Sequence, residues 1–185
     1  TMSFLFNTWN ATTTPFSTIV KQAQEAGYTE PDPREDLNGM DVARKVVIAA
    51  REAGWTSMEL SDVTVESLVP TALENCSLDD FWKEFPQYDA ALAERAANAA
   101  QEGKVLRFVG AVNVTTQSAT VQLQALPSTH AFAGLTGADN VVQVETKRYG
   151  PSGGSTPLVI RGPGAGADVT AAGVLGDLVA LANAK

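Results

Sequence analysis

Residue types that build reactive or cross-linked sites are scarce in this chain of 185 residues. It contains one cysteine, Cys76, and one histidine, His130. No internal disulfide can therefore form, and a zinc site built from histidine and cysteine is excluded. A catalytic thiol would have only His130 as its partner. Because a single free cysteine fits a reducing compartment, we expect the protein to be cytoplasmic.

Positive charge is also scarce. Lysine and arginine number 13 against 21 aspartates and glutamates, which gives a formal net charge of -8. This balance argues against binding to nucleic acid or to an anionic membrane surface, since both require a basic footprint. No run of about 18 apolar residues occurs, so we expect no membrane-spanning segment. Apolar residues make up 44% of the chain, which is ordinary for a folded globular protein.

The first hundred residues show mainly helical periodicity. "PFSTIVKQAQEAG" has apolar residues at helical spacing and ends at Gly27, which predicts a helix with a left-handed stop. Asn38 is expected to be the N-cap of a helix over Gly39 to Ala53. Ser77 is expected to be the N-cap of a short helix in "SLDDFWKEF", and "YDAALAERAANAAQEG" predicts an alanine-rich helix.

Strand periodicity dominates the second half. After a strand in "DVTVESLVP", the segments "KVLRFVGAV" and "ATVQLQAL" flank the polar "NVTTQS", which predicts an antiparallel hairpin. "NVVQVETKRY" and "TPLVIRG" predict two further strands, with Gly150 to Pro157 as a flexible connection, and "VTAAGVLGDLVALANA" predicts the last helix. The expected fold class is α+β, with an antiparallel or mixed sheet covered by helices on one side.

One loop gathers many carboxylates beside a lysine. "GYTEPDPREDLNGMDVARK" carries Glu30, Asp32, Glu35, Asp36 and Asp41, and Lys45 follows one helical turn after Asp41. The pair can be a surface ion pair worth ~0.3–0.5 kcal/mol. Alternatively, the helix from Met40 is apolar on nearly every side, so it should be largely buried and should bring the pair to the rim of the core, from where the lysine can reach a pocket.

A calcium loop is a further interpretation of the crowded acids, but prolines and Arg34 interrupt the spacing of an EF-hand. A second glycine-rich candidate is "IRGPGAGADVTAAG", where a strand leads into a helix and backbone amides are suited to phosphate. It approximates a dinucleotide fingerprint at Gly162, Gly164 and Ala167 but lacks the βαβ unit that the fingerprint requires. A tight structural turn and an edge contact to a cofactor held elsewhere both stay open.

These motifs together resemble the homoserine dehydrogenase family. "GYTEPDPREDLNGMDVARK" is similar to its most specific motif, and "NVTTQSATVQLQ", "DNVVQVETKRY" and "PLVIRGPGAGADVTAAGVLGDL" extend the resemblance over essentially the whole chain. "KVLRFVGAV" and "ETKRY" resemble the short, monofunctional fungal form. One departure is Glu35, where the family pattern has aspartate; the charge is kept.

The resemblance implies an NAD(P)-dependent enzyme that interconverts L-aspartate 4-semialdehyde and L-homoserine in the biosynthesis of threonine, methionine and isoleucine. Lys45 would be the catalytic lysine that protonates the developing alkoxide. Carboxylates suit the α-ammonium group of the substrate. The implied substrate-binding residues are Glu30 and Asp41, with Asp36 in support, and Tyr28, Thr29 and Thr1; the implied cofactor-proximal residues are Gly166, Gly27 and Thr170.

The family also has an N-terminal Rossmann domain for the nicotinamide cofactor, and nothing in this chain resembles it. We therefore expect residues 1–185 to be a substrate-binding, catalytic and dimerisation domain that binds NAD(P)H mainly through another domain. A second lysine and a monovalent-cation site would lie in that other part, and no metal ligand is assigned here. The expected assembly is a homodimer. The alternative is a non-catalytic dimerisation module of the same fold.

Overall fold

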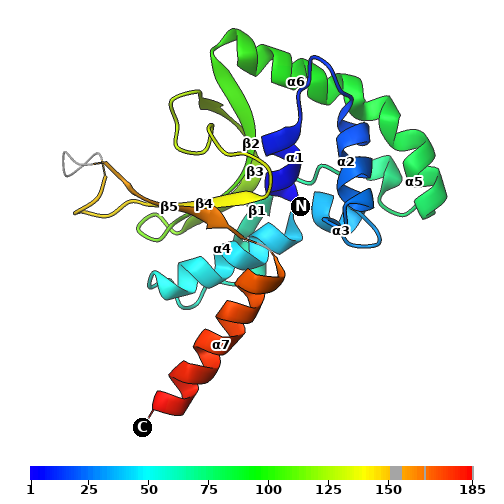
Figure 1. The fold of residues 1–185 in the computed structure, drawn as a ribbon. Coiled ribbons are helices and arrows are strands. Elements are labelled where there is room, and N and C mark those ends of the chain that lie inside the picture. The colour runs from blue at the N-terminus through cyan, green and yellow to red at the C-terminus, as the bar shows by residue number, and fades with distance from the viewer. Residues whose placement is uncertain (151–155, 165, 185) are drawn as a thin grey trace. The chain divides into compact units, whose positions relative to one another are not determined.

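The computed structural model describes residues 1–150, 156–164 and 166–184 and divides into two units, Thr1–Gly134 and Leu135–Lys185. Figure 1 shows helices and strands mixed along the chain, which confirms the expected α+β fold class. Each unit has its own small sheet. None of the helices in the described ranges is long and apolar enough to cross a membrane.

The first unit is built on a three-stranded mixed sheet in the order β1-β3-β2. β2 (Lys104–Asn113) and β3 (Ser118–Pro127) form the predicted antiparallel hairpin, with Phe108 opposite Leu123. Its turn is held by Asn113, whose Oδ1 accepts the amides of Thr115 and Thr116. β1 (Val63–Val65) pairs with β3 in parallel and is shorter than the strand predicted from "DVTVESLVP".

Helices α1, α4 and α6 contact β2 and pack on the sheet face that carries Leu106, Phe108 and Leu123. The predicted helices over residues 16–25, 78–84 and 89–101 are confirmed, and Ser77 caps α5 by accepting the Asp80 amide. The helices of this unit are α1 (Met2–Thr8), α2 (Phe16–Glu25), α3 (Arg34–Leu37), α4 (Met40–Glu52), α5 (Leu78–Glu84) and α6 (Asp89–Gln101), with 3-10 turns η1 (Leu60–Asp62), η2 (Thr71–Leu73) and η3 (Phe85–Tyr88).

Helix α4 lies on the sheet through one face only. Ala43, Val46, Val47 and Ala50 are buried, whereas Ile48 is 62% exposed. The prediction that this helix is largely buried is therefore wrong, since only four of its 13 residues are buried. The apolar residues of α4 are spread around the helix, but the sheet covers only one stripe of its surface. The close approach depends on Gly110, because a Cβ there would lie 2.7 Å from a methyl carbon of Val46.

The second unit contains an antiparallel pair of strands, β4 (Asp139–Val144) and β5 (Leu158–Pro163), and the last helix, α7 (Ala167–Asn183). The strand predicted over 140–149 ends at Val144, because Thr146 Oγ1 accepts the amides of Arg148 and Tyr149 and turns the chain. The predicted connection over Gly150 to Pro157 lies largely outside the described residues.

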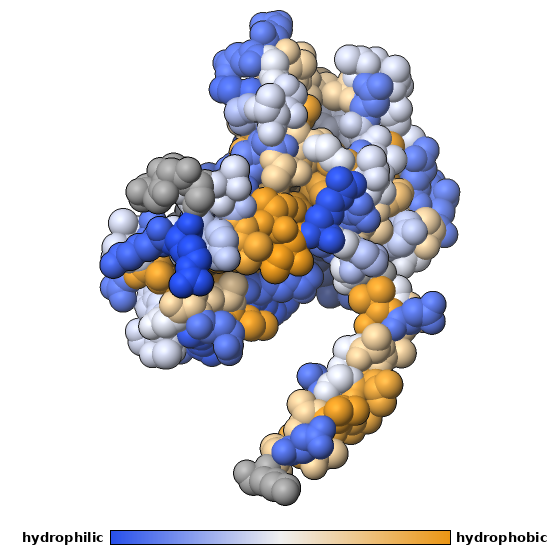
Figure 2. Space-filling view, turned by 60° about the vertical axis from the view of Figure 1, so that its left-hand side comes forward, coloured by the Kyte–Doolittle hydropathy of each residue, from blue (hydrophilic) through white to orange (hydrophobic). Residues whose placement is uncertain are grey.

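Many apolar side chains of the second unit are exposed, and Figure 2 shows orange surface along α7. No residue of α7 is buried among those that the structure describes. An apolar helix surface of this kind is typical of a region that packs against another segment or another chain. The exposed apolar residues of α7 are Val169, Val174, Leu175, Leu178, Val179 and Leu181.

Candidate active site

Two of the predicted site residues, Thr1 and Glu30, bind the carboxylate of a third, Asp36. The Thr1 hydroxyl lies 2.6 Å from Asp36 Oδ1 and also within hydrogen-bond distance of the Tyr28 carbonyl. The other carboxylate oxygen, Oδ2, accepts the amide of Glu30 at 2.9 Å. Asp36 therefore joins the start of α1 to the acidic loop between α2 and α3, and it supports Glu30 through the backbone.

The acidic loop begins where α2 ends. Gly27 has a φ of +74°, and the Tyr28 amide returns to the Ala23 carbonyl at 2.9 Å, so the predicted left-handed stop is confirmed. Tyr28 is 44% exposed, and its ring packs against Phe4 with centroids 4.7 Å apart. The Thr29 hydroxyl donates to the Glu30 carbonyl, so it stays within the loop.

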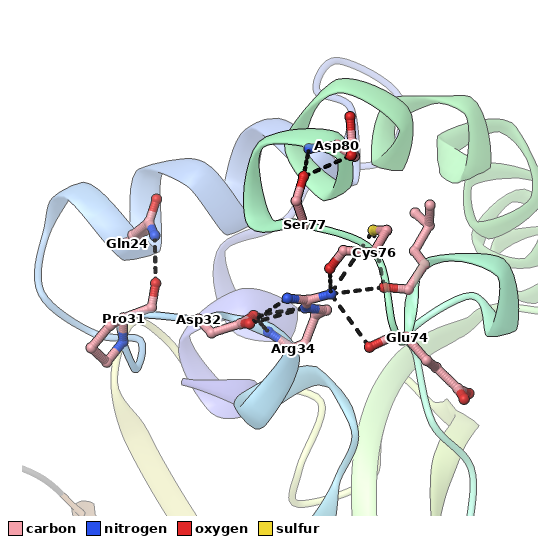
Figure 3. A network of polar contacts seen from close by, with 9 residues as sticks. Gln24, Pro31, Asp32, Arg34, Glu74, Cys76, Ser77 and Asp80 are labelled. Carbon is pink, nitrogen blue, oxygen red and sulfur yellow. Dashed lines mark hydrogen bonds and ion pairs between the residues drawn. The ribbon is translucent and has the colours of Figure 1, made fainter.

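Arg34 anchors the middle of the loop, as Figure 3 shows. Its Nε and Nη2 donate to the two oxygens of Asp32 at 2.9 and 2.6 Å, and this side-chain hydrogen bond lowers the pKa of the Asp32 carboxyl. Its Nη1 donates to the carbonyls of Leu73 and Cys76. This anchor was not predicted, although an aspartate two residues before an arginine at a proline-flanked turn is a local signal for such a pair.

Asp41 and Lys45 form the predicted i,i+4 pair on α4, with 2.8 Å between Asp41 Oδ2 and Lys45 Nζ. Their side chains are 62% and 72% exposed, respectively, so this unit alone presents the pair to solvent, as the surface-pair interpretation describes. The pair is more exposed than the expected position at the rim of the core implies, because it lies away from the face of α4 that packs on the sheet.

The start of α1 lies within electrostatic range of this pair. The charges of Asp36, Asp41 and Lys45 all act at the backbone nitrogen of Thr1. Thr1 thus contacts the acidic loop through Asp36 and Tyr28 and lies within electrostatic range of the first turns of α4. The short helix α1, which was not predicted from the sequence, positions Thr1 beside Asp36.

The start of α4 differs by one residue from the prediction. Gly39, not Asn38, is the N-cap, and Asn38 Oδ1 accepts the Met40 amide at 2.9 Å. Gly39 has a φ of +76°, and a Cβ there would lie 3.0 Å from the Phe108 ring, so both conformation and space favour glycine.

Beside this turn lies an open pocket of about 380 Å³. It is lined by Asn38, Met40, Val65, Ser67, Val69 and Glu74, none of which is a predicted site residue.

Gly166 and Thr170, predicted to lie near the cofactor, belong to the second unit. Gly166 precedes α7 with a φ of +137°, and the Thr170 amide donates to its carbonyl at 3.0 Å. A Cβ at Gly166 would meet no atom within 4 Å, so this backbone is open to a ligand. Within the described ranges, no group of three or more histidine, cysteine or carboxylate side chains is arranged to hold a metal ion.

Comparison with known proteins places this arrangement in a family. The family model described as homoserine dehydrogenase matches residues 1–179. The Saccharomyces cerevisiae homoserine dehydrogenase is 47% identical over 187 residues, which cover 99% of this chain and 51% of the yeast protein. The Zea mays protein named bifunctional aspartokinase/homoserine dehydrogenase 1, chloroplastic, is 48% identical and matches 99% of this chain and 19% of the maize protein.

A solved structure is also similar. A Candida auris protein described as being of unknown function has a TM-score of 0.89 at 43% identity, over 98% of this chain and 50% of that one. The chain therefore spans about half the length of the yeast relative and about a fifth of the maize relative.

Proposed function

The chain belongs to the homoserine dehydrogenase family, and we propose that it is the substrate-binding and catalytic part of an NAD(P)-dependent oxidoreductase. The proposed reaction interconverts L-aspartate 4-semialdehyde and L-homoserine in threonine, methionine and isoleucine biosynthesis. The observation that carries the proposal is that the Thr1 hydroxyl and the Glu30 amide both bind the Asp36 carboxylate. The Asp41–Lys45 pair lies within electrostatic range of Thr1, and these residues match the roles that the family motif implies.

Carboxylates and a lysine suit the two ends of this substrate. Glu30 and Asp41 would bind the α-ammonium group, with Asp36 holding the Glu30 amide in place. Tyr28, Thr29 and Thr1 would border the same group. In the reductive direction, Lys45 Nζ would give a proton to the oxygen of the aldehyde as a hydride reaches its carbon, so that aldehyde, hydride and proton together yield the alcohol.

Hydride transfer is the chemistry that NAD(P) supplies when it is bound. The open backbone at Gly166 fits an edge contact with such a cofactor, and Gly27 and Thr170 are proposed to lie near it. We propose that a domain outside this chain holds most of the cofactor, since the chain spans about half of its yeast relative. The exposure of the Asp41–Lys45 pair supports this division, because a second domain could close over it.

The test is a Lys45→Ala variant of the full-length gene product, assayed for homoserine oxidation. Loss of a general acid should lower kcat by about 10²–10⁴-fold. Lys104→Ala is the matched control, because Lys104 is likewise a lysine in an ion pair, with Glu102 at 2.6 Å. Normal turnover by a Lys45→Ala variant that melts like the wild type would show that Lys45 is only a surface partner of Asp41.

A related proposal is that residues 1–185 alone do not turn over homoserine, because hydride transfer needs a dinucleotide site. Pure chain mixed with homoserine and NAD(P)⁺ should produce no reduced nicotinamide. Turnover by the pure chain would contradict the assignment of the cofactor to another domain.

We also propose a cytoplasmic location, which the single cysteine supports.

The proposed assembly is a homodimer. β4 and β5 expose Val142, Val144, Leu158, Val159 and Ile160, and an isolated two-stranded sheet is marginally stable in water. A second copy could continue this sheet and cover its apolar face. Light scattering should return about twice the mass of one chain, and Ile160→Lys should shift the protein toward the monomer. A wild type that is folded and monomeric would contradict the proposal.

A further inference from the structure

All three nitrogens of the Arg34 guanidinium donate hydrogen bonds to other groups of the protein. Its side chain is 16% exposed, and its Nε and Nη2 donate hydrogen bonds to the two oxygens of Asp32 (Figure 3). Its Nη1 lies 2.8 Å from the Cys76 carbonyl and 3.0 Å from the Leu73 carbonyl. Since every nitrogen of this group already donates to a protein oxygen, Arg34 has little capacity left to bind a substrate directly.

Arg34 connects two distant segments through these contacts. Asp32 belongs to the acidic loop, whereas Leu73 and Cys76 lie about forty positions later in the chain. The guanidinium carbon also lies 5.5 Å from the ring centroid of Phe81, which is fully buried in the main core. The loop is thereby attached to a part of the molecule that packing holds rigid.

The attachment point lies between the two carboxylates proposed to serve the substrate. Glu30 precedes Arg34 and Asp36 follows it, and the Glu30 amide donates to Asp36 Oδ2 across the intervening turn. A second, weaker tether runs from Gln24 Nε2 to the Pro31 carbonyl at 3.2 Å. The course of the chain from Glu30 to Asp36 therefore depends on where Arg34 holds Asp32.

We propose that Arg34 is a positioning residue for substrate binding, which holds Glu30 and Asp36 in place without touching the substrate. This inference rests on the proposed function, because it takes Glu30 as a ligand of the substrate ammonium group. Lysine cannot replace Arg34, since a single ammonium nitrogen cannot make the two parallel bonds to Asp32 and still reach the carbonyls of Leu73 and Cys76.

The first test measures loop placement by hydrogen exchange in the full-length gene product, independently of activity. In an Arg34→Lys variant, amide exchange over residues 28–37 should become roughly tenfold faster or more, while the sheet is unchanged. Arg51→Lys is the matched control, since Arg51 likewise donates to a carbonyl, that of Met58, and to a carboxylate, that of Glu59. Unchanged exchange over residues 28–37, or an equal rise throughout the protein, would overturn the proposal.

The second test separates KM from kcat for homoserine. Arg34→Lys should raise KM by roughly tenfold or more and change kcat by less than about threefold, whereas Arg51→Lys should leave KM unchanged. An unchanged KM in an active Arg34→Lys enzyme would overturn the positioning role. If the wild type itself does not oxidise homoserine, the proposed function fails, and the exchange result still decides whether Arg34 places the loop. Should Arg34→Lys not fold, Asp32→Asn tests the same attachment from its other side.

Discussion

The hydroxyl of Thr1 and the carboxylate of Asp36 lie 2.6 Å apart, although 35 positions separate the two residues in the chain. The hydroxyl has one proton, which Asp36 Oδ1 and the Tyr28 carbonyl share. Through this contact the start of α1 fixes the acidic loop near α4. A residue that family resemblance suggests as a neighbour of the substrate thus also has a structural task.

Thr1→Val should release this contact while keeping the shape of the side chain. We expect the free energy of unfolding to fall by about 0.5–1.5 kcal/mol, the usual net contribution of one hydrogen bond, and the homoserine KM to rise. Urea unfolding and steady-state kinetics measure the two effects. Thr13→Val is the control, because the Thr13 hydroxyl donates to the nearby Asn10 carbonyl and shares a hydrogen bond with the Thr14 hydroxyl, both at the surface. Equal effects of both variants would contradict a special role for Thr1.

Gly110→Ala tests how α4 is seated on the sheet. The added Cβ would lie 2.7 Å from Val46 Cγ2 and 2.9 Å from Val42 Cγ1, so these valine side chains or the helix that carries them must shift. Overpacking of this kind costs about 1–3 kcal/mol, and thermal melts should show the loss. Gly134→Ala is the control, since its Cβ would meet no atom within 4 Å. If Gly110→Ala melts like the wild type, the packing of α4 on β2 is looser than described.

Local sequence signals predicted the elements whose determinants lie close together in the chain. The hairpin of β2 and β3, the Ser77 cap and the left-handed Gly27 each depend on neighbouring residues, and each is confirmed. The error on α4 has the opposite origin. Apolar composition says that a helix can be buried, but only the tertiary structure decides which stripe the sheet covers, and Ile48 lies outside that stripe.

Contacts between distant segments could not be predicted in the same way. Asp89 accepts both the amide and the hydroxyl of Ser17 at the start of α2, 72 positions away, and no local pattern announces that pairing. The Arg34 anchor to residues 73–76 is of the same kind. Helix α1 is different, because Met2, Leu5 and Phe6 already have helical spacing in the sequence and are all buried.

The pH dependence of stability should include a contribution from Glu66. Burial acts to raise the pKa of this carboxyl, but hydrogen bonds from the Arg95 guanidinium and the Leu123 amide outweigh it and hold the pKa below its usual value. A depressed folded-state pKa stabilises the protein above the unfolded value, and this stabilisation is lost as the pH falls through the folded value. Glu66 therefore makes the protein less stable in acid.

Glu66→Gln should lower the melting temperature at neutral pH and reduce its decline below pH about 4.5. Thermal melts across the acid range measure both effects. Glu59→Gln is the control, because its 71% exposed carboxylate pairs with Arg51 at the surface. An acid profile of Glu66→Gln that parallels the wild type would show that other carboxyl groups dominate acid unfolding.

The assignment of Glu30 and Asp41 as ligands of the substrate ammonium group predicts an effect on KM. Glu30→Gln and Asp41→Asn keep size but remove charge, so each should raise the homoserine KM by roughly 10–100-fold, with a smaller change in kcat. Glu35→Gln is the control, since Glu35 is an exposed acid of the same segment to which no role is assigned. Asp41 also lies in the first turn of α4, where a carboxylate stabilises the helix by ~0.3–1 kcal/mol, so melts must accompany the kinetics. If all three variants raise KM equally, the segment from Glu30 to Asp41 acts through its overall negative charge, and Glu30 and Asp41 are not specific ligands.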